Sequence, residues 1–207
     1  MSWIRTIMKP VKLCIENPDY PISTVFAEHN WELSGGTKQI GVLSAAIILS
    51  FNIDTVIEIG LFHGFSSGIL AKALASNTDN GFLLSVDILN RGISRSKKAT
   101  EGIPITHKHV LSDSLLVDYK KELDGRIPGM AFVDGAHDYE HAAYDIDTCS
   151  KLIKKWGFLI VHDYSSGGHP FVYQAVNEFV EKTKWPMFYQ NENRESTDYR
   201  SAIIQKV

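Results

Sequence analysis

Short apolar runs rich in Val, Ile and Phe alternate along this chain with longer amphipathic runs, and this alternation constrains the fold more than any other feature. The apolar runs predict strands at Thr55–Ile59, Phe82–Asp87, Ile105–Leu111, Gly129–Asp134 and Phe158–His162. The amphipathic runs between and after them predict helices near Ser66–Ser76, Ile93–Thr100, Leu115–Leu123 and Tyr139–Ile153. Strands joined by crossover helices form a parallel sheet that is covered on both faces. We therefore predict an α/β, Rossmann-like three-layer sandwich.

The order of elements changes after the fifth strand. A helix is predicted at Phe171–Thr183, and it is followed by the apolar runs WPMFYQN and DYRSAIIQK with the polar turn NENREST between them. Two strands with so short a link must pair antiparallel, because a parallel return needs a longer crossover. The sheet is therefore expected to end in an antiparallel hairpin.

Composition and charge exclude several classes of protein. The chain has 207 residues, a formal net charge of −3 and a pI near 6.2, so it lacks the basic footprint of proteins that bind nucleic acid or anionic membranes. The stretch IGVLSAAIILSFNI is shorter than the roughly 20 residues that span a bilayer and predicts a buried helix. Only two cysteines occur, far apart, as suits a reducing compartment. We expect a cytoplasmic protein with neither a nucleic-acid nor a membrane partner.

The sequence predicts one domain with an N-terminal extension. No linker long enough to separate two domains interrupts residues 36–207. Residues 1–35 contain three prolines and a helical stripe of apolar residues, so we interpret them as an arm or lid. Three positions for this arm stay open: on its own domain, on a second subunit in a homo-oligomer, or over the ligand site.

Polar residues gather where the predicted strands end. In open α/β sheets the ligand binds beyond the carboxyl ends of the strands, so these residues are candidates for the site. They are Glu58 and Gly60 at the end of the first strand, Asp87 at the end of the second, Ser112 and Asp113 after the third, Asp134 at the end of the fourth, and His162 with Asp163 at the end of the fifth.

The loop GLFHG follows the first strand and suits a ligand pressed against backbone. Gly60 and Gly64 have no Cβ, and the helix that starts near Ser66 points its amide-rich end at the same place. A dinucleotide fingerprint would have a central glycine where Phe62 stands, so close approach by a pyrophosphate is disfavoured. The acid Asp87 is suited to accept hydrogen bonds from both hydroxyls of a ribose. These residues together favour an adenosine-bearing ligand, and the competing interpretation is a tight turn with helix caps.

These motifs resemble a known family. EIGLFHGFSS is similar to motif I of the class I S-adenosylmethionine-dependent methyltransferases, and SVDI resembles their acidic motif II. FVDGAHDYEHAAYDI followed by KKWGFLIVHDY is similar to a subgroup of small-molecule O-methyltransferases, which includes sugar and antibiotic-tailoring enzymes and, more distantly, the catechol type. The resemblance covers roughly residues 36–207. It implies a seven-stranded, mostly parallel sheet with an antiparallel C-terminal hairpin strand, and S-adenosylmethionine as cofactor.

The resemblance also implies roles for the cofactor-binding residues. Around the amino-acid end of the cofactor it places Glu58, Gly60, Gly64 and Ser66. It places Asp87 on the ribose, and Ser112 with Asp113 near the adenine.

A metal site is implied at the ends of the fourth and fifth strands. In the metal-dependent relatives, two acids at these positions and an adjacent carboxylate or amide hold magnesium, and here the two acids are Asp134 and Asp163. The third position is Tyr164, which is a poor ligand for a hard cation. His137 and His162 would suit manganese, iron or zinc. The alternative role for the two aspartates is to orient the substrate or to cap a helix.

A hydroxyl acceptor needs a base, or a metal that lowers its pKa. His137, three residues beyond Asp134, is the predicted base because imidazole accepts protons near neutral pH, and His162 is the second choice. His107 and His109 alternate along the third strand, and we interpret them as facing solvent.

The best-supported function at this stage is methyl transfer to a hydroxyl of a small-molecule acceptor, such as a sugar or a polyketide. A nicotinamide-dependent oxidoreductase is the second candidate, and the missing glycine and the hairpin count against it. A cofactor-binding scaffold without chemistry and a metal-dependent hydrolase are weaker alternatives.

Overall fold

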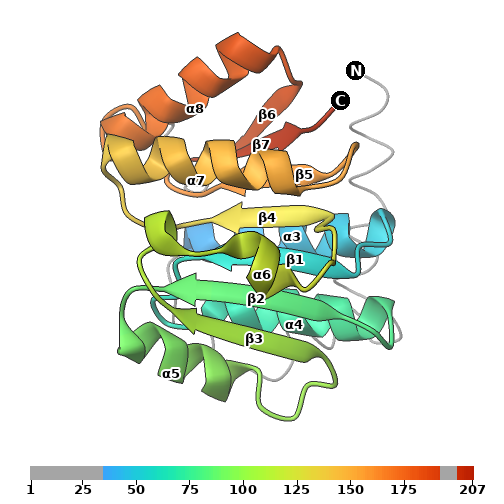
Figure 1. Cartoon of the computed structure of the whole chain (residues 1–207). Helices are drawn as coiled ribbons and strands as arrows, with labels where there is room; N and C mark the ends of the chain where they lie inside the picture. Colours follow the sequence, from blue (N-terminus) through green and yellow to red (C-terminus); the bar gives the residue numbers. More distant parts are fainter. Residues whose placement is uncertain (1–34, 192–199) are drawn as a thin grey trace.

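A seven-stranded sheet forms the centre of the protein (Figure 1). Its strands are β1 (Thr55–Ile59), β2 (Phe82–Asp87), β3 (Thr106–Leu111), β4 (Met130–Val133), β5 (Phe158–Val161), β6 (Met187–Asn191) and β7 (Arg200–Gln205). The computed structural model describes residues 35–191 and 200–207, and the predicted arm lies almost wholly outside them. The strand order is β3-β2-β1-β4-β5-β7-β6, with β1 to β5 parallel and β7 antiparallel to both of its neighbours. The predicted sandwich with an antiparallel hairpin strand is confirmed.

Helices cover both faces of this sheet and enclose two apolar cores. They are α3 (Gly35–Ser50), α4 (Phe65–Asn77), α5 (Asn90–Ala99), α6 (Tyr119–Leu123), α7 (Tyr139–Leu152) and α8 (Pro170–Thr183), with a short 3-10 helix η1 (Ser114–Leu116). In Figure 1, α3 and α4 lie behind the sheet and α6 and α7 in front of it. The apolar stretch predicted as a buried helix is α3. Among the described residues, none of the helices is both long enough and apolar enough to cross a membrane.

Alternation along β1 decides which side chains reach which core. Ile57 and Ile59 pack into the core beneath α6, α7 and α8, whereas Val56 packs into the core beneath α3 and α4. Successive side chains of a strand point to opposite faces, so Glu58 lies on the same face as Val56, under α4. An acid is thereby buried completely among apolar residues.

The prediction of a single helix over Leu115–Leu123 is wrong. The structure has η1 and α6 instead, with Val117 extended between them. The cause is two acidic caps: the Asp113 side chain accepts a hydrogen bond from the Leu115 N–H, and the Asp118 side chain accepts one from the Lys121 N–H. A capping acid satisfies backbone donors at a helix start, so each of these two caps begins a new short helix. For the other elements of residues 55–183 the differences are confined to the element ends.

The central strands carry much of the stability. Leu84 of β2 is fully buried between the sheet and the helices above it, whereas Leu116 is 80% exposed. We expect Leu84→Ala to lower the free energy of unfolding by about 2–5 kcal/mol, because the truncation leaves a cavity. The matched control Leu116→Ala should change it by less than about 0.5 kcal/mol. Urea unfolding followed by circular dichroism measures both, and equal losses in the two variants would contradict this description of the core.

Candidate functional site

The loop between β1 and α4 lies against the end of β4. Gly60 has a left-handed φ of 84°, and a Cβ at this position would lie 1.9 Å from the carbonyl oxygen of Asp134. Gly64 has a φ of 73°, and its Cβ would lie 2.7 Å from the backbone of Arg95. Both positions therefore require glycine, for conformation and for space. The close packing brings the loop and the side chain of Asp134 to one place.

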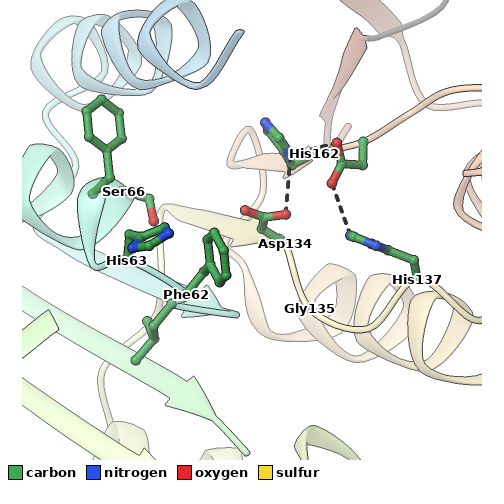
Figure 2. A pocket seen from close by; sticks show the side chains of 10 residues that line it. Phe62, His63, Ser66, Asp134, Gly135, His137 and His162 are labelled. Atoms are coloured by element: carbon green, nitrogen blue, oxygen red, sulfur yellow. Dashed lines mark ion pairs between the residues drawn. The ribbon is translucent and has the colours of Figure 1, made fainter. Parts of the chain in front are cut away.

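A cavity of about 380 Å³ opens where these segments meet (Figure 2). Phe62, His63 and Ser66 line one side of it, and Asp134, His137 and His162 line the other. Its remaining lining residues are Leu61, Phe65, Gly135 and Asp163. Of the predicted site residues, the cavity thus brings together Ser66, Asp134, His137 and Asp163, and it adds His162, the second choice of base.

The carboxylate of Asp163 is surrounded by three imidazole rings. Its Oδ2 lies 3.0 Å from His137 Nε2, and its Oδ1 lies 3.2 Å from His162 Nδ1 and 3.8 Å from His169 Nε2. Burial alone would raise the pKa of Asp163, but hydrogen bonds from His137 and His162 hold it well below the ordinary range. Asp163 also has a left-handed φ of 56°, which is uncommon for a residue with a side chain. The group is therefore an ionised carboxylate held at a specific position.

His162 and His137 contact different oxygens of this carboxylate. His162 Nδ1 is also 3.3 Å from Asp134 Oδ1, so this nitrogen faces two aspartates. The hydrogen bond that His137 donates to Asp163 raises the pKa of His137, and partial burial opposes this change. The ring of His137 packs against that of His169 at a centroid distance of 4.2 Å. Sequence reasoning missed His169, and the only signal for it was its place in the loop SSGGHP after β5.

Glu58 lies beneath the glycine loop and is fully buried. Its Oε1 accepts a hydrogen bond from Ser66 Oγ at 2.6 Å, and its Oε2 accepts hydrogen bonds from Ser67 Oγ at 2.8 Å and Ser85 Oγ at 2.6 Å. Burial raises the pKa of Glu58 to about 7, although the three hydroxyl groups oppose this. Both carboxylate oxygens are therefore already used to tie the first turn of α4 to β1 and β2.

The hydrogen-bonded group around Glu58 extends to β3 through two histidines. Ser85 Oγ lies 2.8 Å from His107 Nε2, and His107 Nδ1 lies 3.0 Å from Thr100 Oγ1. His109 Nε2 lies 3.0 Å from Ser96 Oγ of α5. The expectation that His107 and His109 face solvent is wrong, because α5 covers this side of the edge strand. Burial lowers their pKa values to about 3 and about 4, so both rings are neutral at pH 7.

Asp87 holds the other side of the glycine loop. Its Oδ2 accepts a hydrogen bond from the Leu61 N–H at 2.9 Å, and its Oδ1 accepts one from the Leu89 N–H at 2.6 Å. The backbone carbonyl of Asp87 accepts from the Ser112 N–H at 3.1 Å, which fixes the start of the loop after β3. Each carboxylate oxygen has more than one lone pair, so both can still accept from a ligand.

Asp113 lies after β3 and faces α7 as well as capping η1. Its Oδ1 is 3.3 Å from His141 Nε2, and Asp138 flanks the other ring nitrogen of His141. Glu58, Gly60, Gly64, Asp87, Ser112 and Asp113 do not line the cavity described above. Glu58 and Asp87 contact residues that do line it, Ser66 and Leu61.

Comparison with known proteins agrees with this geometry. Residues 57–164 match the model of a family described as a methyltransferase domain. These residues run from β1 to the residue after Asp163, so they contain the loop and Asp134, His137, His162 and Asp163, whereas His169 lies beyond them. Among curated proteins, no sequence matches the chain.

Solved structures share the fold over most of the chain. An O-methyltransferase from Bacillus cereus in complex with SAH superposes with a TM-score of 0.63 at 13% identity, covering 96% of each chain. The O-methyltransferase TomG from Streptomyces achromogenes, in complex with SAM, gives 0.62 at 21% identity and 92% of each chain. The N-methyltransferase NodS from Bradyrhizobium japonicum, with S-adenosyl-L-homocysteine, gives 0.57 at 14% identity, covering 97% of this chain and 98% of NodS. At these identities the likeness shows the fold alone.

The buried acid predicts a dependence of stability on pH. Because the pKa of Glu58 rises from 4.5 in water to about 7, the folded state binds this proton more tightly than the unfolded chain. The contribution of Glu58 to the free energy of unfolding therefore falls as the pH rises from 4.5 to 7. Gln has no charge to bury, so Glu58→Gln should gain roughly 3 kcal/mol relative to wild type between pH 5 and pH 8.

Urea unfolding at a series of pH values measures this difference. The matched control is Glu181→Gln, which changes an exposed glutamate and should follow the wild-type curve. Parallel curves for wild type and Glu58→Gln would contradict a proton held at Glu58.

Proposed function

This chain belongs to the methyltransferase domain family, and on that premise we propose that it binds S-adenosylmethionine and transfers the methyl group to a hydroxyl of a small molecule. The observation that carries the proposal is the cavity between the glycine loop and the cluster of Asp134, His137, His162 and Asp163. One wall suits a cofactor, and the other supplies groups that can hold an acceptor and remove its proton.

The residues of the loop fit S-adenosylmethionine. Gly60 and Gly64 let the loop pack closely against the backbone at Asp134 and Arg95, and no side chain caps the N-terminus of α4 at Gly64. The first turn of a helix favours a negative charge, so this end suits the carboxylate of the amino-acid part. Asp87, held by two backbone N–H groups, suits the ribose hydroxyls. Glu58 acts in this proposal through Ser66 and Ser67, as a positioning residue for the helix start.

The contacts of His137 support its role as the base that removes the proton of the acceptor. When bound, S-adenosylmethionine supplies an electrophilic methyl group on a positively charged sulfur. Because His137 Nε2 lies 3.0 Å from the ionised Asp163, we assign its proton to Nε2, which leaves Nδ1 as the basic nitrogen. His137 Nδ1 would take the proton of the acceptor hydroxyl, and bound S-adenosylmethionine would supply the methyl group to the acceptor oxygen and keep the electron pair of the carbon–sulfur bond on its sulfur. Asp163 stabilises the imidazolium that results.

The two aspartates predicted as metal ligands stay part of this proposal. Asp134 and Asp163 both line the cavity, and a divalent cation held there would lower the pKa of the acceptor hydroxyl. Tyr164 supplies no third oxygen, because it is buried and its hydroxyl donates a hydrogen bond to Asn177 Oδ1 at 3.1 Å. The residues therefore fit a cation through the two carboxylates and His162, which lies between them.

Cofactor binding gives the first test. Isothermal titration of the full chain with S-adenosylmethionine should show one saturable site, and Asp87→Ala should weaken binding by about 10- to 100-fold, because a charged acceptor is lost. The matched control is Asp79→Ala, an exposed aspartate that should leave the affinity unchanged. Saturable binding of NAD in place of S-adenosylmethionine would favour the oxidoreductase alternative and contradict the proposal.

The acceptor gives the second test. A panel of sugars, polyketides, phenols and amines, incubated with S-adenosylmethionine labelled on the methyl group, should yield an O-methylated product by mass spectrometry. His137→Gln keeps a donor toward Asp163 and lacks the base, so the rate should fall by about 10²- to 10⁴-fold with unchanged cofactor affinity. The wild-type rate should also fall as the pH is lowered through the pKa of His137. Transfer to amines alone, or a fully active His137→Gln, would contradict the assignment.

A further inference from the structure

We propose that Asp134, His162 and Asp163 form a mixed nitrogen–oxygen site that selects a divalent transition metal, such as Mn²⁺, Fe²⁺, Co²⁺ or Zn²⁺, over Mg²⁺. The inference makes His162 a ligand rather than a spare base. The binding itself stands on the geometry of these side chains, and its part in methyl transfer rests on the proposed function.

The spacing of the three side chains is that of ligands around one ion. One imidazole nitrogen and one oxygen of each carboxylate lie within 4.8 Å of one another. His162 Nδ1 is 3.3 Å from Asp134 Oδ1 and 3.2 Å from Asp163 Oδ1. Atoms that bind one ion at about 2.1 Å lie about 3.0 Å apart at a right angle and about 3.4 Å apart at a tetrahedral angle. Both measured separations fall in this interval.

The donor chemistry decides the class of metal. Mg²⁺ prefers oxygen ligands and near-ideal octahedral geometry, and this cluster offers a nitrogen at its centre while Tyr164 points its hydroxyl elsewhere. Imidazole suits these transition metals, and the general order of affinities rises from Mn²⁺ through Fe²⁺ and Co²⁺ to Cu²⁺ and falls again at Zn²⁺. The nitrogen of His162 therefore shifts the preference of the site away from Mg²⁺.

Burial and access suit a catalytic rather than a structural metal. The side chains of His162, Asp163 and Asp134 are 11%, 16% and 25% exposed, so they are partly shielded from water. All three line the cavity, so further coordination positions would face the space proposed for the acceptor.

The proposed base, His137, contacts the other oxygen of Asp163 and is therefore separate from the proposed metal site. Asp163 uses Oδ1 toward His162 and Oδ2 toward His137. One carboxylate thus orients the proposed base with one oxygen and completes the ligand set with the other. His137, Asp163 and His169 form a second close group, and His169 reaches Asp163 Oδ1 only at 3.8 Å.

Metal binding to the full chain, after treatment with a chelator, tests the proposal. Titration with Co²⁺ followed by visible absorption, and with Mn²⁺ followed by electron paramagnetic resonance, should show one site that millimolar Mg²⁺ does not displace. Electron spin-echo modulation of the Mn²⁺ form should show coupling to one imidazole ¹⁴N, which oxygen ligands alone cannot produce.

Variants identify the ligand. His162→Ala should lose the ¹⁴N coupling and weaken Co²⁺ binding by more than about 10-fold. His162→Asp replaces nitrogen by oxygen, so it should bind a metal again with the preference moved toward Mg²⁺. The matched control is His141→Asn, because His141 also lies between two aspartates, Asp113 and Asp138, and its loss should change none of these readouts.

The outcomes separate this proposal from the proposed function. Mg²⁺ that competes equally with Co²⁺, a lack of ¹⁴N coupling, or a His162→Ala variant with wild-type affinity would overturn the metal assignment, even where titration of the same samples shows normal S-adenosylmethionine binding. Selective Co²⁺ binding that depends on His162 in a chain that does not bind S-adenosylmethionine would support the metal site and overturn the methyltransferase proposal.

Discussion

The contact between Gly60 and the backbone of Asp134 is the constraint on which the rest of the site depends. The carbonyl oxygen of Asp134 occupies the space that a side chain at position 60 would fill. Since β1 and β4 are neighbours in the sheet, this contact brings the end of each strand to one cavity. The loop that suits a cofactor and the side chains that suit an acceptor thereby share one space. The site requires glycine at position 60, and the parallel pairing of β1 and β4 places the ends of these two strands side by side.

Two carboxylates serve this arrangement in opposite ways. Glu58 is buried under the loop and satisfied by three serine hydroxyls, so it holds the helix start in place, with a pKa raised to about 7. Asp163 is surrounded by imidazoles that keep it ionised at the cavity wall. In the proposed function, the first shapes the cofactor side, and the second sets the charge and the proton positions of the acceptor side. Different surroundings thus give one chemical group two roles.

The sequence was sufficient for the features that follow from local pattern. The alternation of apolar runs predicted the sheet and its hairpin, and the strand-end rule located Asp134, His162 and Asp163 near one another. Long-range packing explains the failures. His107 and His109 looked exposed because an alternating edge strand does not show that α5 will cover it. The hydrogen-bond partners of Glu58 come from α4 and β2, so no short motif contains them together with Glu58. His169 lies in the loop after β5, outside the motifs that contain the other site residues. The predicted helix is interrupted at Val117 because Asp113 and Asp118 each cap a separate short helix.

The most direct test of the central claim is a crystal structure of the full chain grown with S-adenosylhomocysteine. The account predicts the ribose on Asp87, the amino-acid part at the start of α4, and the sulfur at the cavity, facing the cluster of Asp134, His137, His162 and Asp163. A ligand bound elsewhere, or in this loop with its sulfur turned away from that cluster, would contradict the claim that the cavity is where a methyl group meets its acceptor.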